Sequence, residues 1–245
     1  MQILLKLQYE GTNYSGFQRQ KNAMTVQEKL ENALEPIFGT NIKLHAASRT
    51  DAGVHALGQR VSFHASFLNI PLLKLPNVIN STLPKDISVV DAELVSDDFH
   101  PRFDAKQKTY SYSFLNTPHP NPLLARYSVH VPKKLAPEKM QKACEYFMGR
   151  HDFAAFCATG GSQKTTIREI YGIYLDVCEN GLIKLSVTGN AFLYNMVRIM
   201  AGTIYYAGIG KIPACTVEDI IRSKQRTQAG KTMPPHGLVL EEVLY

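Results

Sequence analysis

The 245-residue chain is predicted to be an α+β protein built from two ferredoxin-like, or RRM-like, βαββαβ subdomains. Two observations favour this class. Strand-like alternation and helix-like periodicity follow one another in the order βαββαβ over the first hundred residues, and the same order recurs in the remainder. We therefore expect subdomains at 1–104 and 105–245, a largely antiparallel sheet and a central active-site cleft. The duplication rests on element order, because the halves show no residue-level repeat.

The first half begins with a strand, since apolar residues alternate in ILLKLQY at 3–9. A helix is predicted to start at Thr25, where T-V-Q-E is a capping box, and to end near Gly39. Alternation or helical spacing predicts the remaining elements of this half: strands at 42–48, 59–65 and 87–94, and a weaker helix at 72–80 that is broken at Pro76.

The second half repeats the order with different lengths. Its predicted strands lie at 107–115, 128–131, 167–178, 182–189 and 237–245, and Glu-Asn-Gly is a turn signal between the third and fourth. Its predicted helices lie at 136–149 and 192–208, with a short one from Thr216. The helix at 192–208 is the most apolar element of the chain, which predicts a buried position.

The composition is that of a soluble globular protein, with 44% hydrophobic and 20% charged residues. The net charge of +6 fits a polyanionic partner. The four cysteines include no C-x-x-C pair, so neither a zinc site nor a disulfide framework is expected. No secretory signal or membrane-spanning run is recognised, and the expected location is the cytoplasm.

The segment ASRTDAGVHALGQ at 47–59 contains a single carboxylate, Asp51, between two predicted strands. Thr-Asp-Ala-Gly is typical of a turn in which an aspartate accepts backbone N–H groups. Alternatively, the loop presents a carboxylate nucleophile or base, with Arg49 to bind an anionic partner. The spacing alone leaves both interpretations open.

Two further segments combine aromatic residues with cations. YEGTNYSGFQRQ at 9–20 includes Gln18 and Arg19 and is either a glycine-rich hairpin or an RNA-facing loop. RFDAKQKTYSYSF at 102–114 begins with Arg102 and places Tyr110 and Tyr112 on one face of a strand. Such aromatic pairs usually pack in a core, but beside cations they can also stack on bases.

Arg198 lies within the apolar stretch GNAFLYNMVRIMAG at 189–202. A buried arginine is costly unless it is paired, so it should reach solvent or meet a carboxylate, and Asp51 is a candidate partner. The histidines form no ligand pattern, and for His55 we expect a structural or surface role. Without a ligand pattern, no metal is expected. No P-loop or GxGxxG motif occurs, so no nucleotide cofactor is expected either.

Five ordered blocks together resemble one family across nearly the whole chain. They are YEGTNYSGFQRQ, RTDAGVHALGQ, KTYSYSF, GNAFLYNMVRIMAG and PPHGLVLEEV. The chain is similar to the tRNA pseudouridine synthase A family. The resemblance implies a cofactor-free isomerisation in which a uridine is detached from C1′ of its ribose and rejoined through C5. It further implies tRNA as partner, with uridines 38, 39 and 40 of the anticodon stem-loop as targets, and a homodimer.

The resemblance also implies roles for individual residues. Asp51 corresponds to the nucleophile, Tyr110 to the tyrosine that stacks on the target base and assists proton removal, and Arg198 to the ion-pair partner of the aspartate. Arg49 corresponds to the residue linked to base flipping. These residue types suit the chemistry, because a base must leave its stack before C1′ or C6 can be attacked, and a carboxylate can add to either atom. The sequence does not decide between the two.

Two other classes of protein remain as alternatives. A non-catalytic RRM-like RNA-binding protein would keep the tyrosines and the basic loops but would have no need of Asp51. A glycosidase-like hydrolase usually requires two carboxylates, whereas the loop contains one.

Overall fold

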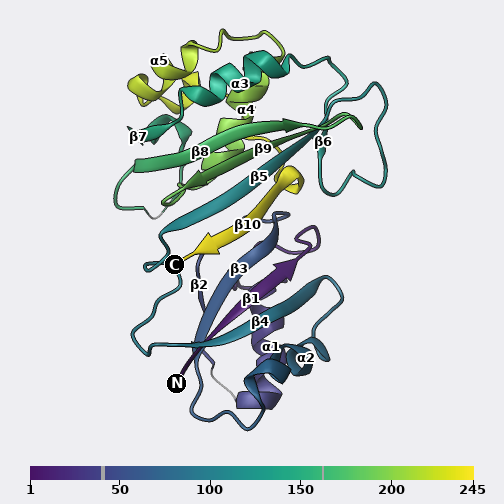
Figure 1. Ribbon diagram of the computed structural model, residues 1–245, viewed down its shortest axis with the longest axis vertical. Helices are drawn as coiled ribbons and strands as arrows, with labels where there is room; N and C mark the ends of the chain where they lie inside the picture. Colours follow the sequence, from purple (N-terminus) through teal and green to yellow (C-terminus); the bar gives the residue numbers. More distant parts are fainter. Residues whose placement is uncertain (40–41, 162) are drawn as a thin grey trace. The chain divides into compact units, whose positions relative to one another are not determined.

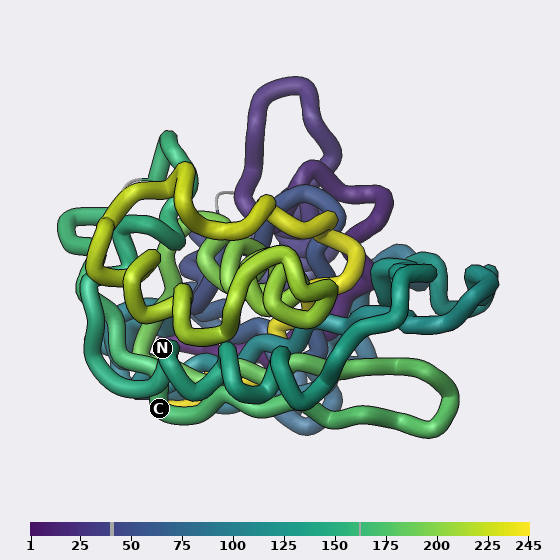
Figure 2. Tube along the Cα trace, turned by 90° about the horizontal axis from the view of Figure 1, so that it is seen from above, coloured from purple at the N-terminus to yellow at the C-terminus, as the bar shows by residue number. Residues whose placement is uncertain are grey.

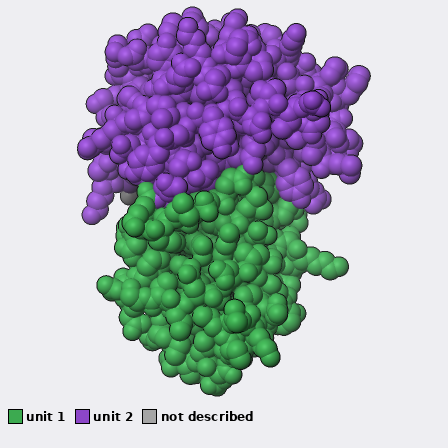
Figure 3. Space-filling model, in the orientation of Figure 1, with its two compact units in different colours: residues 1–106, 239–245 green, residues 107–238 purple. Residues whose placement is uncertain are grey.

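The computed structural model describes residues 1–39, 42–161 and 163–245. These residues form two compact units (Figure 3). Unit 1 consists of Met1–Lys106 and Val239–Tyr245, and unit 2 consists of Gln107–Leu238. The first boundary lies two residues from the predicted one. The segment Val239–Tyr245, expected in the second subdomain, belongs to unit 1.

Unit 1 contains a sheet in which β1 is central (Figure 1). Its strands are β1 (Gln2–Tyr9), β2 (His45–Ala46), β3 (His55–His64), β4 (Ile87–Val95) and β10 (Leu238–Leu244). β1 pairs antiparallel with β3 and with β4, and β2 pairs antiparallel with β3. β2 covers only the far end of the β3 edge, so β10 pairs in parallel with its first residues, His55 and Ala56. This pairing explains why the C-terminal segment belongs to unit 1.

Two helices cover one face of this sheet (Figure 1). They are α1 (Val26–Phe38) and α2 (Leu75–Asn80), the latter preceded by the 3₁₀ turn η1 (Leu72–Lys74). The side chain of Thr25 accepts a hydrogen bond from Glu28 N at 3.3 Å, and Gly39 ends α1 at a φ of +87°, so both predicted ends are confirmed. Between the helices and the strands, Leu5, Leu30 and Phe63 are fully buried.

Unit 2 contains an antiparallel sheet of order β5-β9-β8-β7. Its strands are β5 (Gln107–Leu115), β7 (Gly149–Asp152), β8 (Ile167–Val177) and β9 (Leu182–Gly189), and β6 (Val129–His130) pairs in parallel with β5. Tyr112, Phe114 and Leu185 point to the same buried side of the sheet. In Figure 2 the green β8–β9 hairpin projects as a long loop.

Three helices and several 3₁₀ turns complete unit 2. They are α3 (Pro137–Glu145), α4 (Met196–Gly208), α5 (Thr216–Ser223), η2 (Ala154–Phe156), η3 (Arg226–Gln228) and η4 (Pro235–Gly237). α3 packs against α4 and β8, and α4 packs against β5. Most residues of α4 are buried, as its apolar sequence predicts.

Several predicted boundaries were wrong for local reasons. Pro76 lies in the first turn of α2, where a missing N–H costs nothing, so it starts the helix instead of breaking it. The helix predicted at 136–149 ends at Glu145, and Gly149 follows with a φ of +91°. The helix predicted at 192–208 begins only at Met196, because Asn195 is left-handed, with a φ of +59°.

The predicted strand at 42–48 is reduced to His45–Ala46, whereas its partner is longer than predicted and begins at His55. The predicted α+β class with largely antiparallel strands is nevertheless confirmed. The central cleft stays a prediction. None of the described helices combines the length and the apolar character needed to cross a membrane.

Candidate active site

The loop that carries Asp51 connects β2 to β3 in unit 1 and is fastened to the segment that follows β1. Phe17 N donates to Thr50 O at 3.0 Å, and Gly53 N donates to Tyr14 O at 3.3 Å. The turn itself is closed by Val54 N, which donates to Asp51 O at 3.1 Å. Asp51 remains half-buried. The loop is therefore a turn, as its sequence predicts, and it also presents its carboxylate from a fixed backbone.

Buried side chains fix the base of the same loop. The hydroxyls of Thr50 and Tyr9 are hydrogen-bonded at 2.7 Å, and Gln59 Nε2 donates to Tyr9 Oη at 3.4 Å. Gln59 also exchanges two bonds with the backbone of Ser48, donating to its carbonyl at 2.8 Å and accepting from its N–H at 3.2 Å. Because all four residues are buried, breaking one bond would leave a polar atom without water, at a cost of about 1–3 kcal/mol.

Two glycines allow the two loops to approach each other. A Cβ on Gly16 would lie 2.9 Å from Thr50 O, and Gly16 has a φ of +97°. A Cβ on Gly11 would collide with the carbonyl of Val54. The block YEGTNYSGFQRQ thus supplies the surface on which the RTDAG loop rests, which explains its two glycines.

His55 has a structural position beside this contact. It is buried, and its Nδ1 accepts a hydrogen bond from Gly11 N at 3.0 Å. Glu10 Oε1 lies 3.7 Å from the same nitrogen. Among the described residues, no three His, Cys, Asp or Glu side chains gather in a metal-binding group.

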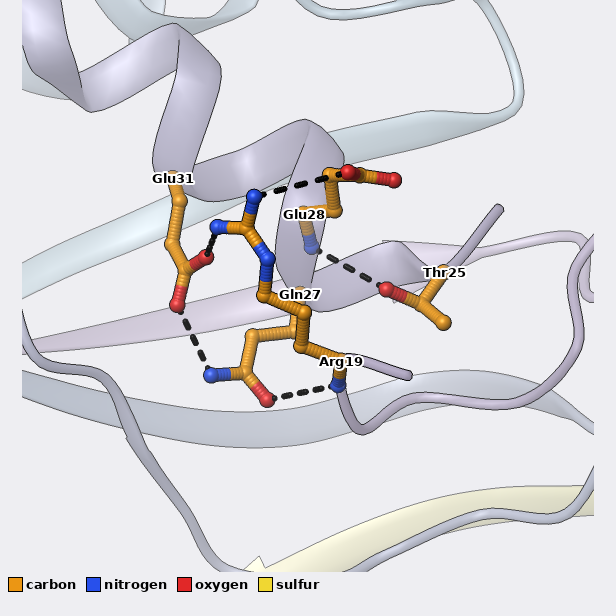
Figure 4. Close-up of polar contacts among 5 residues, drawn as sticks. All are labelled: Arg19, Thr25, Gln27, Glu28 and Glu31. Atoms are coloured by element: carbon orange, nitrogen blue, oxygen red, sulfur yellow. Dashed lines mark hydrogen bonds and ion pairs between the residues drawn. The ribbon is translucent and has the colours of Figure 1, made fainter. Parts of the chain in front are cut away.

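The predicted RNA-contact residues of unit 1 are all exposed, but one of them is already in ion pairs. Arg49, Gln18 and Arg102 are exposed. Arg19 is also exposed, but its guanidinium forms ion pairs with Glu31 at 2.7 Å and with Glu28 at 3.5 Å (Figure 4).

The backbone near Arg19 is held as well. Arg19 N donates to Gln27 Oε1 at 3.0 Å, and Gln27 Nε2 donates to Glu31 at 2.8 Å (Figure 4). The start of α1 therefore neutralises and orients Arg19. Any phosphate that it bound would have to compete with two carboxylates.

Tyr110 lies on β5 in unit 2 and is nearly buried, with an exposed fraction of 8%. Its ring meets Phe192 edge to face, with centroids 5.1 Å apart. Tyr112 lies on the same side of the strand, is fully buried, and donates its hydroxyl to Pro234 O at 2.8 Å. Burial raises the pKa of Tyr112 well above its usual value, and the charge of Arg198 opposes that rise. Tyr112 is thus a core residue.

Arg198 lies in the first turn of α4 and is half-buried. Its Nε donates to Met233 O at 2.7 Å, and its Nη1 donates to Asn195 Oδ1 at 2.6 Å. In return, Met233 N donates to Arg198 O at 3.2 Å. The sequence predicted solvent or a carboxylate for this guanidinium; the side chain is half-buried, and it also donates to a carbonyl and an amide of unit 2, which the sequence did not predict. Its ion pair with Asp51 stays a prediction.

Sequence reasoning missed the residues that position these side chains. Gln59 and Tyr9 have the pattern of ordinary strand residues, and only the structure shows that both are buried and hydrogen-bonded to each other. Asn195 carried a usable signal, because asparagine tolerates a left-handed backbone better than other non-glycine residues. That conformation turns the chain into α4 and aims the amide at Arg198.

The fold and the loop together indicate a class of protein. Two α+β units, a basic chain and a fixed loop with one half-buried carboxylate beside exposed cations fit an RNA-modifying enzyme. The sequence pattern of the family described as tRNA pseudouridine synthase matches residues 7–104 and 143–245.

Curated relatives support the match over the full length. A tRNA pseudouridine synthase A of Caldicellulosiruptor saccharolyticus is 47% identical over 243 residues, which are 99% of each chain. Proteins of the same name from Thermoanaerobacter sp. and Ruminiclostridium cellulolyticum are each 46% identical, again over 99% of both chains. The chain belongs to the tRNA pseudouridine synthase family, so the predicted enzyme class is confirmed.

Solved structures are more distant. An archaeal box H/ACA sRNP Nop10-Cbf5 complex contains a chain that matches with a TM-score of 0.41 and 12% identity. The match covers 93% of this chain and 59% of that one. This similarity is too low to add to the family assignment.

Proposed function

We propose that this protein converts uridine to pseudouridine in the anticodon stem-loop of tRNA, at positions 38, 39 and 40, with Asp51 as the nucleophile. The observation that carries the proposal is the fixed loop around Asp51. Nucleophilic catalysis requires a reactive group held close to its target, and a rigid backbone supplies that placement in advance. The 46–47% identity to proteins named tRNA pseudouridine synthase A supports tRNA as substrate.

The reaction is an isomerisation, so its atoms balance without a second substrate. The N1–C1′ bond breaks, the uracil turns within the site, and a C5–C1′ bond forms. The hydrogen of C5 leaves as a proton, and N1 gains one. A carboxylate that adds to C1′ or to C6 divides this rearrangement into easier steps and is regenerated at the end. One carboxylate is sufficient for this reaction, because no water has to be activated.

Tyr110 and Arg198 are proposed to assist from unit 2. The ring of Tyr110, braced edge-on by Phe192, suits stacking on the detached base, and its hydroxyl suits removal of the C5 proton. Arg198 is proposed to keep Asp51 ionised, because a nearby cation favours the charged form of a carboxyl group. Its bonds to Met233 and Asn195 support this role, since they fix the direction of the guanidinium.

Arg49, Gln18, Arg19 and Arg102 are proposed to contact the RNA. Arg49 is exposed two positions from Asp51, which suits insertion into the space that a flipped base leaves. If the three arginines neutralise phosphates, each contact should steepen the dependence of log affinity on log salt by about 0.7–0.9.

We also propose that the protein acts as a homodimer in the cytoplasm. The dimer rests on the family resemblance, because α4 buries its apolar residues within unit 2 and so offers no extended apolar surface. Sedimentation of the purified protein with and without tRNA tests the oligomeric state. The cytoplasm is proposed because tRNA is handled there, and it fits the four free cysteines.

The central experiment compares wild type with Asp51→Asn on uridine-labelled tRNA and measures conversion and binding separately. Asparagine keeps the shape of the side chain and removes the nucleophile, so conversion should fall at least roughly 1,000-fold while binding persists. Asp91→Asn is the matched control, because Asp91 is an exposed carboxylate on β4 of the same unit. Full conversion by Asp51→Asn would remove Asp51 from the mechanism.

The same assay separates the alternative classes. A wild-type protein that binds tRNA without any conversion would be the RRM-like binding protein. Release of free uracil in place of pseudouridine would identify the hydrolase.

A further inference from the structure

Three aromatic rings form a column on the surface of unit 1. The rings of His45 and His100 have centroids 5.0 Å apart at an interplanar angle of 58°, and those of His100 and Phe103 are 4.3 Å apart at 37°, so both pairs are tilted. His45 lies on β2, whereas His100 and Phe103 lie in the segment that follows β4. The column ends at Phe103, whose exposed fraction is 74%.

The turn that carries Phe103 is fastened by its own backbone. Phe103 N and Asp104 N both donate to His100 O, at 3.1 and 3.0 Å. His100 N donates to Asp104 Oδ2 at 2.7 Å, and Arg102 N donates to His100 Nδ1 at 3.2 Å. The phenyl ring is thus held in solvent by a closed turn.

The ends of this segment are also anchored to unit 1. Gln2 Nε2 donates to Phe99 O at 3.3 Å, and the hydroxyl of Tyr245 donates to Pro101 O at 3.1 Å. The rings of Phe99 and Tyr245 meet edge to face at 4.8 Å. Because the turn is fixed at both sides, binding at Phe103 would require little further ordering.

Charged groups of both signs lie near the column, and Arg102 is the cation beside its exposed end. The guanidinium of Arg102 lies 5.9 Å from the centroid of the Phe103 ring. The acidic groups of this segment are Asp97, Asp98 and Asp104. One oxygen of Asp104 accepts from His100 N, and Asp97 pairs with the N-terminal ammonium at 3.6 Å. An exposed ring next to cations is the arrangement by which proteins hold single-stranded nucleic acid.

We propose that Phe103 is a base-stacking residue, on which an unpaired nucleotide of the tRNA lies while Arg102 meets a neighbouring phosphate. This inference rests on the proposed function for its substrate and adds a contact that is separate from the chemistry of Asp51. A nucleobase would extend the column His45–His100–Phe103 by a fourth ring. A nucleic acid is favoured over a protein partner, because one base needs one ring, whereas a protein interface needs a broad apolar surface.

The first test compares Phe103→Ala with Phe103→Trp in binding to unmodified tRNA. Loss of one stacked base should weaken binding roughly 5- to 150-fold. Phe103→Trp should bind at least as well as wild type. Phe103→Ala should raise KM with little change in kcat at saturating tRNA, because a stacking contact made equally in the ground state and the transition state contributes to binding only.

Salt dependence distinguishes the ring from its charged neighbour. Phe103→Ala should leave the slope of log Kd against log salt unchanged, since stacking releases no counterion. Arg102→Ala should reduce that slope by about 0.7–0.9. A reduced slope for Phe103→Ala would contradict the stacking role.

The second test uses the fact that the chain contains no tryptophan. The indole introduced by Phe103→Trp is then the only one, and stacking on a base should quench its fluorescence when tRNA is added. Leu73→Trp is the matched control, because Leu73 is 94% exposed in the same unit and lies outside the column. The fluorescence test does not use Phe103→Ala, so it still tests base stacking if that variant folds poorly.

Three results would overturn the proposal: equal tRNA affinity of Phe103→Ala and wild type, equal quenching at the two introduced tryptophans, or a change in sedimentation of Phe103→Ala without tRNA. The last result would make this surface an interface between copies of the chain. Failure of the proposed function would give another result: the wild type would form no pseudouridine. That result does not depend on how Phe103→Ala binds tRNA.

Discussion

The loop that carries Asp51 and the helix start that carries Arg198 are built in different ways. The loop has no regular structure and is held by close backbone contact with residues 11–17, which glycines permit. Arg198 lies on a regular helix and is held by polar partners on either side of it in the chain, Asn195 and Met233. A larger side chain in place of a glycine should therefore displace the Asp51 loop. Removal of hydrogen-bond donors or acceptors should displace the start of the helix that carries Arg198.

Tyr110, like Arg198, lies on a regular element, in this case a strand. Its hydroxyl is the group with a proposed chemical role. Tyr110→Phe keeps the ring and should lower kcat about 100- to 10,000-fold, the usual contribution of general acid–base catalysis, with little loss of tRNA binding. Single-turnover pseudouridine formation measures the effect.

Tyr112→Phe is the control, two positions along the same strand. It should lose about 1–2 kcal/mol of unfolding free energy, because Pro234 O loses its donor, and should keep its kcat. Normal turnover by Tyr110→Phe would remove Tyr110 from the chemistry.

Arg198→Ala removes the donors at the start of α4 together with the charge. If Arg198 has its proposed role, loss of its charge should reduce kcat about 100- to 1,000-fold, with a smaller change in tRNA affinity. Arg226→Ala is matched to it, since Arg226 lies in the same unit and also donates to backbone and side-chain oxygens, those of Gly230 and Thr232. Similar losses in kcat for both variants would show that Arg198 is only structural.

Gly16→Ala tests the loop by volume alone. Its Cβ would press on Thr50 O, so the loop should shift and kcat should fall by up to about 100-fold, with about 1–3 kcal/mol lost from the free energy of unfolding.

Gly39→Ala separates backbone strain from contact, because Gly39 has a similar φ of +87° but nothing within 4 Å of its Cβ position. It should lose about 1–3 kcal/mol of unfolding free energy, because φ +87° with ψ −178° is a conformation essentially restricted to glycine, and it should keep full activity. If both variants convert tRNA equally well, close packing against residue 16 does not position Asp51.

The smallest expected effect concerns His45, at the end of the ring column away from Phe103. Burial, and then the neighbouring His100 and Lys43, lower the pKa of His45 below its usual value. The unfolded chain therefore binds a proton more readily than the folded one. The stability associated with the neutral ring is present above about pH 6.5 and is lost as the pH falls toward the folded pKa.

Urea unfolding between pH 7.5 and 5 measures how steeply the free energy of unfolding depends on pH. His45→Gln should flatten this dependence, whereas His119→Gln, at an exposed position in unit 2, should leave it as it is. An unchanged slope in His45→Gln would show that the ring column does not resist protonation.

Much of the fold could be read from local patterns. Alternation and capping predicted β1 and α1 with nearly the right ends, because Thr25 and Gly39 act through their own neighbours in the chain. The failures came where distant residues decide. β10 comes from the end of the chain, yet it pairs with His55 and Ala56 on the same strand, β3, that β2 pairs with at Val61 and Ser62. No local pattern contains a partner so distant in the sequence.

The sequence by itself determined the family and the identities of the proposed catalytic residues, because Asp51, Tyr110 and Arg198 lie in ordered blocks that can be matched letter by letter. The tertiary structure alone decided how they are supported. The Thr50–Tyr9 hydrogen bond, the room that Gly16 leaves and the carbonyl that receives Arg198 join residues 34 to 41 positions apart. Such contacts depend on which backbone groups meet when the chain is packed, and a linear pattern does not encode them.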